Sequence, residues 1–152
     1  MVGAKPYPDP CVSGQKLSAS HGEPAEDVTS YRQVVGALQY CMLTRPEIAY
    51  SVNQLCQHLH APTKIHLKSA KRVLRYLKGT VDHGLYFSKG TLGITAYCDT
   101  DWSGDATDHR STTGYSIFFG PCLVSWCAKK QSVVSRSSTE SEYRALAMVV
   151  AE

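Results

Sequence analysis

The sequence predicts an α+β protein, with helices in its first half and a small group of strands followed by a helix in its second. Apolar residues recur at helical spacing up to about residue 78, whereas short runs rich in β-branched and aromatic residues follow Gly90. The charge changes at the same place. Residues 1–90 carry 11 Lys and Arg against 6 Asp and Glu, and residues 91–152 carry 5 against 7. We therefore expect an extended tail over 1–27, a helical region over 28–90 and an α/β region over 91–152.

The composition is typical of a globular protein that does not enter a membrane. Hydrophobic residues make up 43% of the chain and charged residues 19%. No stretch approaches the roughly 20 apolar residues that span a bilayer, and the first residues lack the apolar core of a signal peptide. We expect an intracellular location and no membrane partner.

Neither disulfides nor a zinc site is expected. The six cysteines include no Cys-x-x-Cys pair, so we interpret them as free and mostly buried thiols. His58, His60 and His66 have no cysteine or carboxylate at ligand spacing. We interpret them as solvated or half-buried helix residues.

Three helices are expected after the tail, which its four prolines predict to be extended. The first helix should begin at Ser30, which forms a capping-box pattern with Gln33, and Pro46 should end it or open the next one. A second helix is expected over 47–60. The third, over about 64–78, is the most regular, and Gly79 stands where a C-terminal cap belongs.

The third predicted helix carries a row of cations. The row consists of Lys64, Lys68, Lys71, Arg75 and Lys78, with Arg72 beside it. Neighbours in the row are four or three residues apart, which places them on one face of the helix. No acidic residue interrupts this segment. Such a face suits a phosphate backbone, which binds cations by releasing its counterions. The alternative is an ordinary solvated surface; the strict spacing and the missing acids favour nucleic acid.

Three strands and a last helix are expected in the second half. The strands are predicted over 92–98, 113–119 and 123–128, and Gly120-Pro121 fits a hairpin between the second and third. The last helix should begin near Thr139, where its apolar periodicity starts.

Acidic residues near these elements could hold a metal ion. Asp99 and Asp101 fall on one side of the first strand if the strand extends that far, and paired carboxylates suit Mg²⁺. Taken alone, this cluster is better explained as a polar turn. Glu142 and Glu140 each complete a capping-box pattern, so helix capping alone accounts for either one. A shared site requires Glu142 to face the strand of Asp99, which periodicity does not establish.

Together these segments resemble the Pol polyproteins of Ty1/copia-type retrotransposons. The matching segments have the order and spacing of the family. They are Tyr31–Tyr40, Thr44–Tyr50, Arg72–Thr80, Tyr97–Gly104, Arg110–Tyr115, Ser125–Gln131 and Ser137–Tyr143. The resemblance covers nearly the whole chain. It implies the thumb or connection region of a reverse transcriptase over the helices and the first part of an RNase H domain, three antiparallel strands and a helix, over the remainder. The polymerase hairpin Tyr-x-Asp-Asp does not occur in this sequence.

The resemblance also implies part of a nuclease site. RNase H cleaves the RNA of an RNA–DNA hybrid with two Mg²⁺ ions held by four carboxylates. By position, Asp99 matches the first-strand aspartate and Glu142 the first-helix glutamate, while Asp101 is at most an additional ligand. The family's other two aspartates follow the first helix, beyond Glu152. We therefore expect weak Mg²⁺ binding and little or no cleavage.

Three functions stay open at this point. The first is a nuclease fragment that uses Asp99 and Glu142. The second is a non-catalytic module that binds RNA–DNA hybrid or duplex through 64–78, and the third is a relic reading frame without a selected role. The resemblance favours an inactive piece of Pol, for which the missing remainder of the Pol chain is a further candidate partner.

Overall fold

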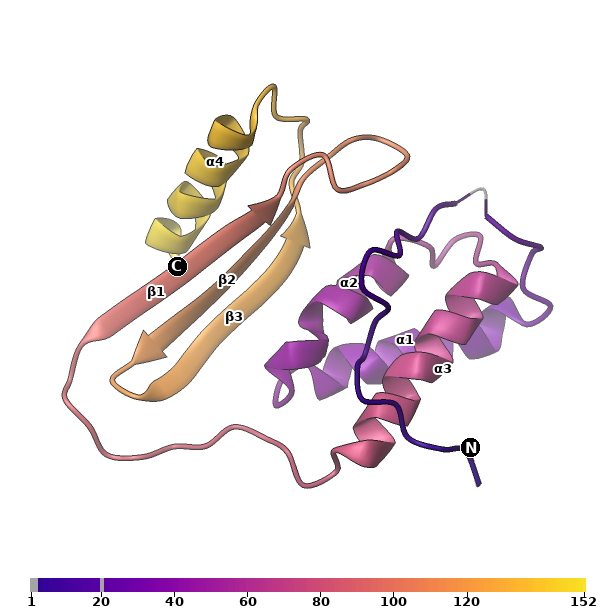
Figure 1. Cartoon of the computed structure of the whole chain (residues 1–152), viewed down its shortest axis with the longest axis horizontal. Helices are drawn as coiled ribbons and strands as arrows, with labels where there is room; N and C mark the ends of the chain where they lie inside the picture. Colours follow the sequence, from indigo (N-terminus) through magenta and orange to yellow (C-terminus); the bar gives the residue numbers. More distant parts are fainter. Residues whose placement is uncertain (1–2, 20) are drawn as a thin grey trace. The chain divides into compact units, whose positions relative to one another are not determined.

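The computed structural model describes residues 3–19 and 21–152, which form two compact units divided between Gly84 and Leu85. The first unit is helical, and the second combines a sheet with a helix (Figure 1). This mixture of helix and strand confirms the α+β class. In the described part of the chain, no helix has the length and apolar character needed to cross a membrane.

The described residues of the first unit form three α-helices and one 3₁₀ turn. In chain order these are α1 (Val28–Cys41), η1 (Pro46–Ile48), α2 (Ala49–Cys56) and α3 (Lys64–Gly79). The single helix expected over 47–60 is wrong: Pro46 opens a 3₁₀ turn instead, and the α-helix that follows has only eight residues. The third helix is confirmed. It includes Gly79 as its last residue, and Thr80 is its C-cap.

Local hydrogen bonds explain where α1 and α3 begin. Asp27 Oδ1 accepts a hydrogen bond from Ser30 N at 2.8 Å, so Asp27 caps α1 and Ser30 lies inside its first turn. The capping box expected for Ser30 is therefore wrong. At the start of α3, Thr63 N donates to His66 Nδ1 at 2.9 Å, so a histidine takes the place that Glu or Gln usually has in a capping box.

The core of the first unit lies where its three α-helices meet. The buried residues of this core are Tyr31, Val35, Leu38, Ile48, Val52, Leu55, Ala70 and Val73. The Tyr31 hydroxyl donates to Leu55 O at 2.8 Å, which satisfies the polar end of a buried ring. His58 and His66 are also buried, with their rings stacked 3.9 Å apart between centroids. The expectation of solvated or half-buried histidines is wrong for this pair.

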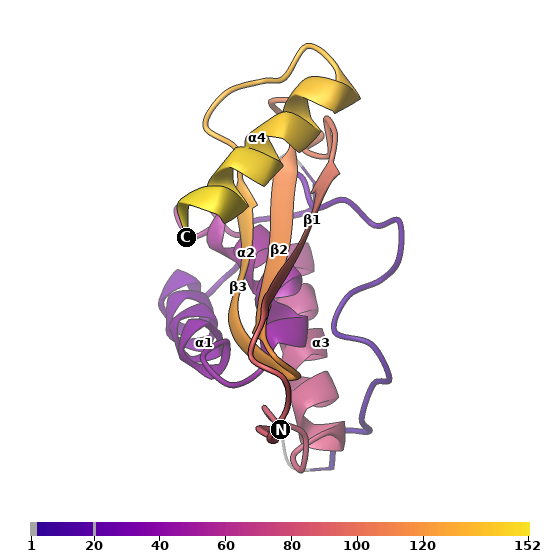
Figure 2. The ribbon, with the colours of Figure 1, turned by 90° about the vertical axis from the view of Figure 1, so that its left-hand side faces the viewer.

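The second unit is a three-stranded antiparallel sheet with a helix across one face (Figures 1 and 2). Its elements are β1 (Ile94–Asp101), β2 (Thr112–Phe119), β3 (Cys122–Lys130) and α4 (Ser138–Ala151). The strands lie in the order β1-β2-β3, so β2 is central, and α4 packs on β1 and β2. The three expected strands and the helix are confirmed, although β1 begins and ends later than predicted. Gly120 turns the β2–β3 hairpin with a φ of +57°, a value that glycine adopts without strain.

All six cysteines are free, as expected. They are not mostly buried, however: Cys11 and Cys98 are exposed, and the other four are partly exposed.

Candidate functional site

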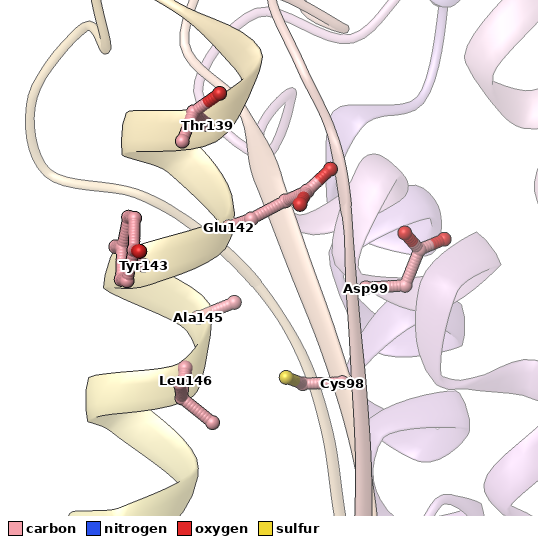
Figure 3. Close-up of a pocket in the computed structure, with 7 residues that line it drawn as sticks. All are labelled: Cys98, Asp99, Thr139, Glu142, Tyr143, Ala145 and Leu146. Carbon is pink, nitrogen blue, oxygen red and sulfur yellow. The ribbon is translucent and has the colours of Figure 1, made fainter.

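A cavity of about 450 Å³ lies between α4 and β1 (Figure 3). Its lining consists of Cys98, Asp99, Thr139, Glu142, Tyr143, Ala145 and Leu146. Asp99 and Glu142, the two carboxylates singled out in the sequence, are therefore both at this cavity although they are 43 positions apart in the chain.

The two carboxylates do not converge. Figure 3 shows Glu142 pointing from α4 toward β1, whereas Asp99 points away from α4 on the other side of the strand. Side chains alternate along a strand, and the two neighbours of Asp99 on β1, Cys98 and Thr100, face the helix. The Thr100 hydroxyl lies 3.0 Å from the hydroxyl of Ser141 on α4. Because β1 continues to Asp101, this aspartate falls on the same side as Asp99.

These carboxylates do not fit a two-ion site in the arrangement observed. Mg²⁺ requires near-octahedral coordination by oxygen ligands. Among the residues that the structure describes, no group of three His, Cys, Asp or Glu side chains is close enough to hold a metal ion. The Asp101 carboxylate instead lies against Gly104, whose N–H donates to Asp101 O at 3.1 Å.

The two glutamates at the start of α4 differ in their surroundings. Ser137 is the N-cap residue, and its Oγ accepts a hydrogen bond from Glu140 N at 3.1 Å. The Glu140 carboxylate accepts hydrogen bonds from Arg136 N and from Arg144 Nη2, both at 2.8 Å. These contacts, the Arg136 backbone first, lower the pKa of Glu140. Helix capping therefore explains Glu140, but the alternative capping pattern that included Glu142 is not used.

A buried polar network fastens the first turn of α4 to the sheet. Gln131 Nε2 donates to Thr113 Oγ1 and to Ser141 O, each at 3.0 Å, and Gln131 Oε1 accepts from Ser135 Oγ at 3.0 Å. All four residues are buried. Because Ser141 immediately precedes Glu142, this network fixes where Glu142 leaves the helix.

The cations of α3 occupy different environments. Lys68 and Lys71 are exposed. Lys64 is exposed as well, but its Nζ lies 2.7 Å from Glu23 Oε2 and 3.3 Å from Glu26 Oε1. The other three, Arg72, Arg75 and Lys78, contact residues 4–9, which we call the N-terminal strap.

The strap meets the side chains of Arg72, Arg75 and Lys78 through one aromatic ring and three main-chain carbonyls. The ring of Tyr7 lies 4.4 Å from the guanidinium carbon of Arg72 and 3.8 Å from that of Arg75, measured to the ring centroid. The carbonyl contacts are Arg75 Nε to Lys5 O at 2.5 Å, Lys78 Nζ to Ala4 O at 3.0 Å and Arg72 Nε to Asp9 O at 3.1 Å. Three of the six predicted nucleic-acid ligands thus contact the strap, and a fourth, Lys64, is paired with acidic residues of the same unit.

Comparison with known proteins identifies the family of this chain. Over its whole length the chain is 49% identical to the retrovirus-related Pol polyprotein from transposon RE1 of Arabidopsis thaliana and 48% identical to that from transposon RE2 of the same plant. Over 94% of its length it is 36% identical to the Pol polyprotein from transposon TNT 1-94 of Nicotiana tabacum. The chain belongs to the Ty1/copia-type Pol polyproteins. The resemblance found in the sequence motifs is therefore confirmed.

This Pol segment spans only about a tenth of each of those relatives: 10% of the RE1 and RE2 polyproteins and 11% of the TNT 1-94 polyprotein. No family model matches the segment, and no solved structure matches it either. Its place in the Pol family thus rests on sequence identity over the full chain.

Two features of this Pol segment were missed in the sequence. Tyr7 was assigned to an extended tail, because prolines reveal backbone conformation but not what the backbone packs against. Gln131 was part of a family motif without an assigned role. A buried Gln between a strand and a helix start has no periodic signal, and its partners Thr113 and Ser141 are at least ten residues away in the chain.

Proposed function

We propose that this segment is the end of the reverse-transcriptase region and the start of the RNase H region of its Pol polyprotein, and that it binds RNA–DNA hybrid or duplex without cleaving it. The observation that carries the proposal is α3, a sixteen-residue helix with six cations and no Asp or Glu. Exposed Lys and Arg near a duplex displace condensed counterions, which supplies most of the sequence-independent binding energy. Relatives that bear the name Pol are consistent with a nucleic-acid partner.

The direction of the carboxylates supports binding without cleavage. Mg²⁺, when bound, would activate a water and stabilise the leaving oxygen in hydrolysis of a phosphodiester. Asp99 and Glu142 are the two carboxylates that the Pol resemblance assigns to such an ion. The Asp99 carboxylate lies on the far side of β1 from Glu142. An ion on either side of the strand would therefore contact only one of these two carboxylates.

Binding is tested by the fluorescence anisotropy of a labelled RNA–DNA hybrid across a salt series. The double variant Lys68→Gln/Lys71→Gln removes two exposed charges of α3. Its plot of log affinity against log salt should be shallower by about 1.8, because each phosphate that is no longer neutralised reduces the slope by about 0.9. The matched control is Lys16→Gln/Lys89→Gln, which removes two charges outside α3 and should leave the slope unchanged. Equal slopes for both double variants would exclude α3 as the binding face.

Hybrid-directed cleavage is a second candidate function, favoured by the presence of Asp99 and Glu142 at one cavity. It requires Mg²⁺-dependent cutting of the hybrid RNA by the purified chain. That cutting should disappear in the variant Asp99→Asn; if it persisted, the nuclease assignment of Asp99 would be wrong.

A further inference from the structure

The N-terminal strap presents to α3 the chemical groups of an unpaired nucleotide strand. The first of these groups is a planar ring. Tyr7 lies over the guanidinium groups of Arg72 and Arg75, at 4.4 and 3.8 Å. Single-stranded nucleic acids are recognised in the same way, because every unpaired base has a π-face that can stack on an arginine. In a duplex that face is covered by the neighbouring bases.

The second group is a set of hydrogen-bond acceptors on either side of the ring. The carbonyls of Ala4 and Lys5 precede Tyr7 and accept from Lys78 and Arg75, and the carbonyl of Asp9 follows it and accepts from Arg72. In a nucleotide strand, phosphates flank each base. Phosphate oxygens carry a negative charge that the strap carbonyls lack, so they would bond to these cations more strongly than the carbonyls do.

We infer that an unpaired nucleic-acid strand competes with the N-terminal strap for Arg72, Arg75 and Lys78. A base then replaces the Tyr7 ring, and phosphates replace the strap carbonyls. This inference rests on the proposed binding of nucleic acid by α3 and deepens it: Lys68 and Lys71 are available to any phosphate backbone, whereas the arginines select single-stranded ends or overhangs. The strap opposes binding because it is tethered next to its own site.

Two substitutions weaken the strap without removing a cation from α3. Tyr7→Ala deletes the ring. Gly79→Ala acts from the helix side: an added Cβ would lie 2.8 Å from Pro6 Cβ, so Pro6 must move. Tyr86→Ala is the matched control, since it deletes a tyrosine that is 83% exposed and belongs to the second unit.

The measurement is the affinity of each variant for labelled oligothymidylate and for a blunt RNA–DNA hybrid. Tyr7→Ala should raise the oligothymidylate affinity about fivefold, because the competing strap loses its cation–π contacts with Arg72 and Arg75. Gly79→Ala should raise it as well, because Pro6 of the strap is displaced. Hybrid affinity should change by less than about twofold, because its bases stay stacked. Tyr86→Ala should change neither. Unchanged or weaker binding of oligothymidylate by both strap variants would overturn the inference.

Hydrogen exchange in the unmodified chain gives an independent test. Tyr7 N donates to Arg75 O at 3.4 Å, so oligothymidylate should speed exchange of the Tyr7 amide as the strap is displaced. Slower or unchanged exchange at saturating oligothymidylate would contradict displacement. The salt slope of the Lys68→Gln/Lys71→Gln variant reports on α3 binding itself. The two ideas can therefore fail separately.

Discussion

Asp99 and Glu142 line the same cavity, yet their carboxylates lie on opposite sides of β1. Strand alternation is the cause: the β1 residues beside Asp99, Cys98 and Thr100, face α4. Moving the Asp99 carboxylate to the helix side would require a shift of the β1 register by one residue. That shift would also move all the remaining side chains of the strand to the opposite face. Membership of the Pol family thus coexists with a geometry that keeps Asp99 and Glu142 apart.

The two glutamates of α4 should respond differently to neutralisation. Glu140→Gln should lower the melting temperature, because it weakens the contacts of the carboxylate with Arg136 N and Arg144 at the start of the helix. Glu142→Gln should leave it nearly unchanged. Thermal unfolding followed by tryptophan fluorescence makes the comparison, since both tryptophans, Trp102 and Trp126, are in the second unit. A larger decrease for Glu142→Gln would assign it a structural role that the contacts do not indicate.

Removing the centre of the polar network should destabilise the second unit substantially. Gln131→Ala leaves the buried groups of Thr113, Ser135 and Ser141 without the partner they have here. We expect a decrease of about 2–3 kcal/mol in the free energy of unfolding. Ser132→Ala, an exposed neighbour, is the control and should cost less than about 0.5 kcal/mol. Equal decreases in the two variants, measured by urea unfolding, would show that the network contributes little.

The stability of the first unit should fall in mild acid because of His66. Burial, and then the charge of the stacked His58, lower the pKa of His66 from 6.5 to about 4. The unfolded chain therefore takes up this proton below pH 6.5 while the folded unit stays neutral until about pH 4. The contribution of His66 to the free energy of unfolding is complete above pH 6.5. It declines between pH 6.5 and pH 4, by at most about 3 kcal/mol.

Hydrogen exchange of the amides of Val35 and Leu38, in the core of the first unit, measures this decline. In His66→Gln the side chain no longer titrates, while its amide oxygen can still accept the capping hydrogen bond from Thr63 N. The pH dependence should then flatten between 6.5 and 4. The same slope in the variant and the unmodified chain would mean that another group is responsible.

The second unit has a separate acid-sensitive contact, between Asp105 and Lys130. Burial alone would raise the pKa of Asp105, but Lys130 Nζ at 2.7 Å and the amides of Thr107 and Asp108 outweigh it and hold the pKa at about 2. This stabilisation is complete above pH 3.8 and disappears as the pH falls toward 2.

Lys130→Met should cost about 2 kcal/mol near neutral pH and remove most of the acid dependence between pH 3.8 and 2. Lys129→Met is the control, because this neighbouring lysine is exposed. Tryptophan fluorescence during urea unfolding, at a series of pH values, provides both measurements. If the two lysine variants were destabilised equally, the ion pair would not have the assigned role.

Local patterns in the sequence predicted the elements but not the contacts between distant segments. The row of cations was visible because helical spacing alone places Lys64, Lys68 and Lys71 on one face. The direction of Asp99 relative to α4 depends on which face of β1 the helix covers, and periodicity is the same for either choice. The strap was invisible for a similar reason: Tyr7 meets Arg75 across 68 positions of sequence, and neither residue type signals the other.

The central claim, binding without cutting, is tested most directly by incubating a labelled RNA–DNA hybrid with the purified chain in Mg²⁺ and following binding and RNA length in the same sample. We predict salt-dependent binding with the RNA strand intact. Cleavage of the RNA that Asp99→Asn abolishes would contradict the account.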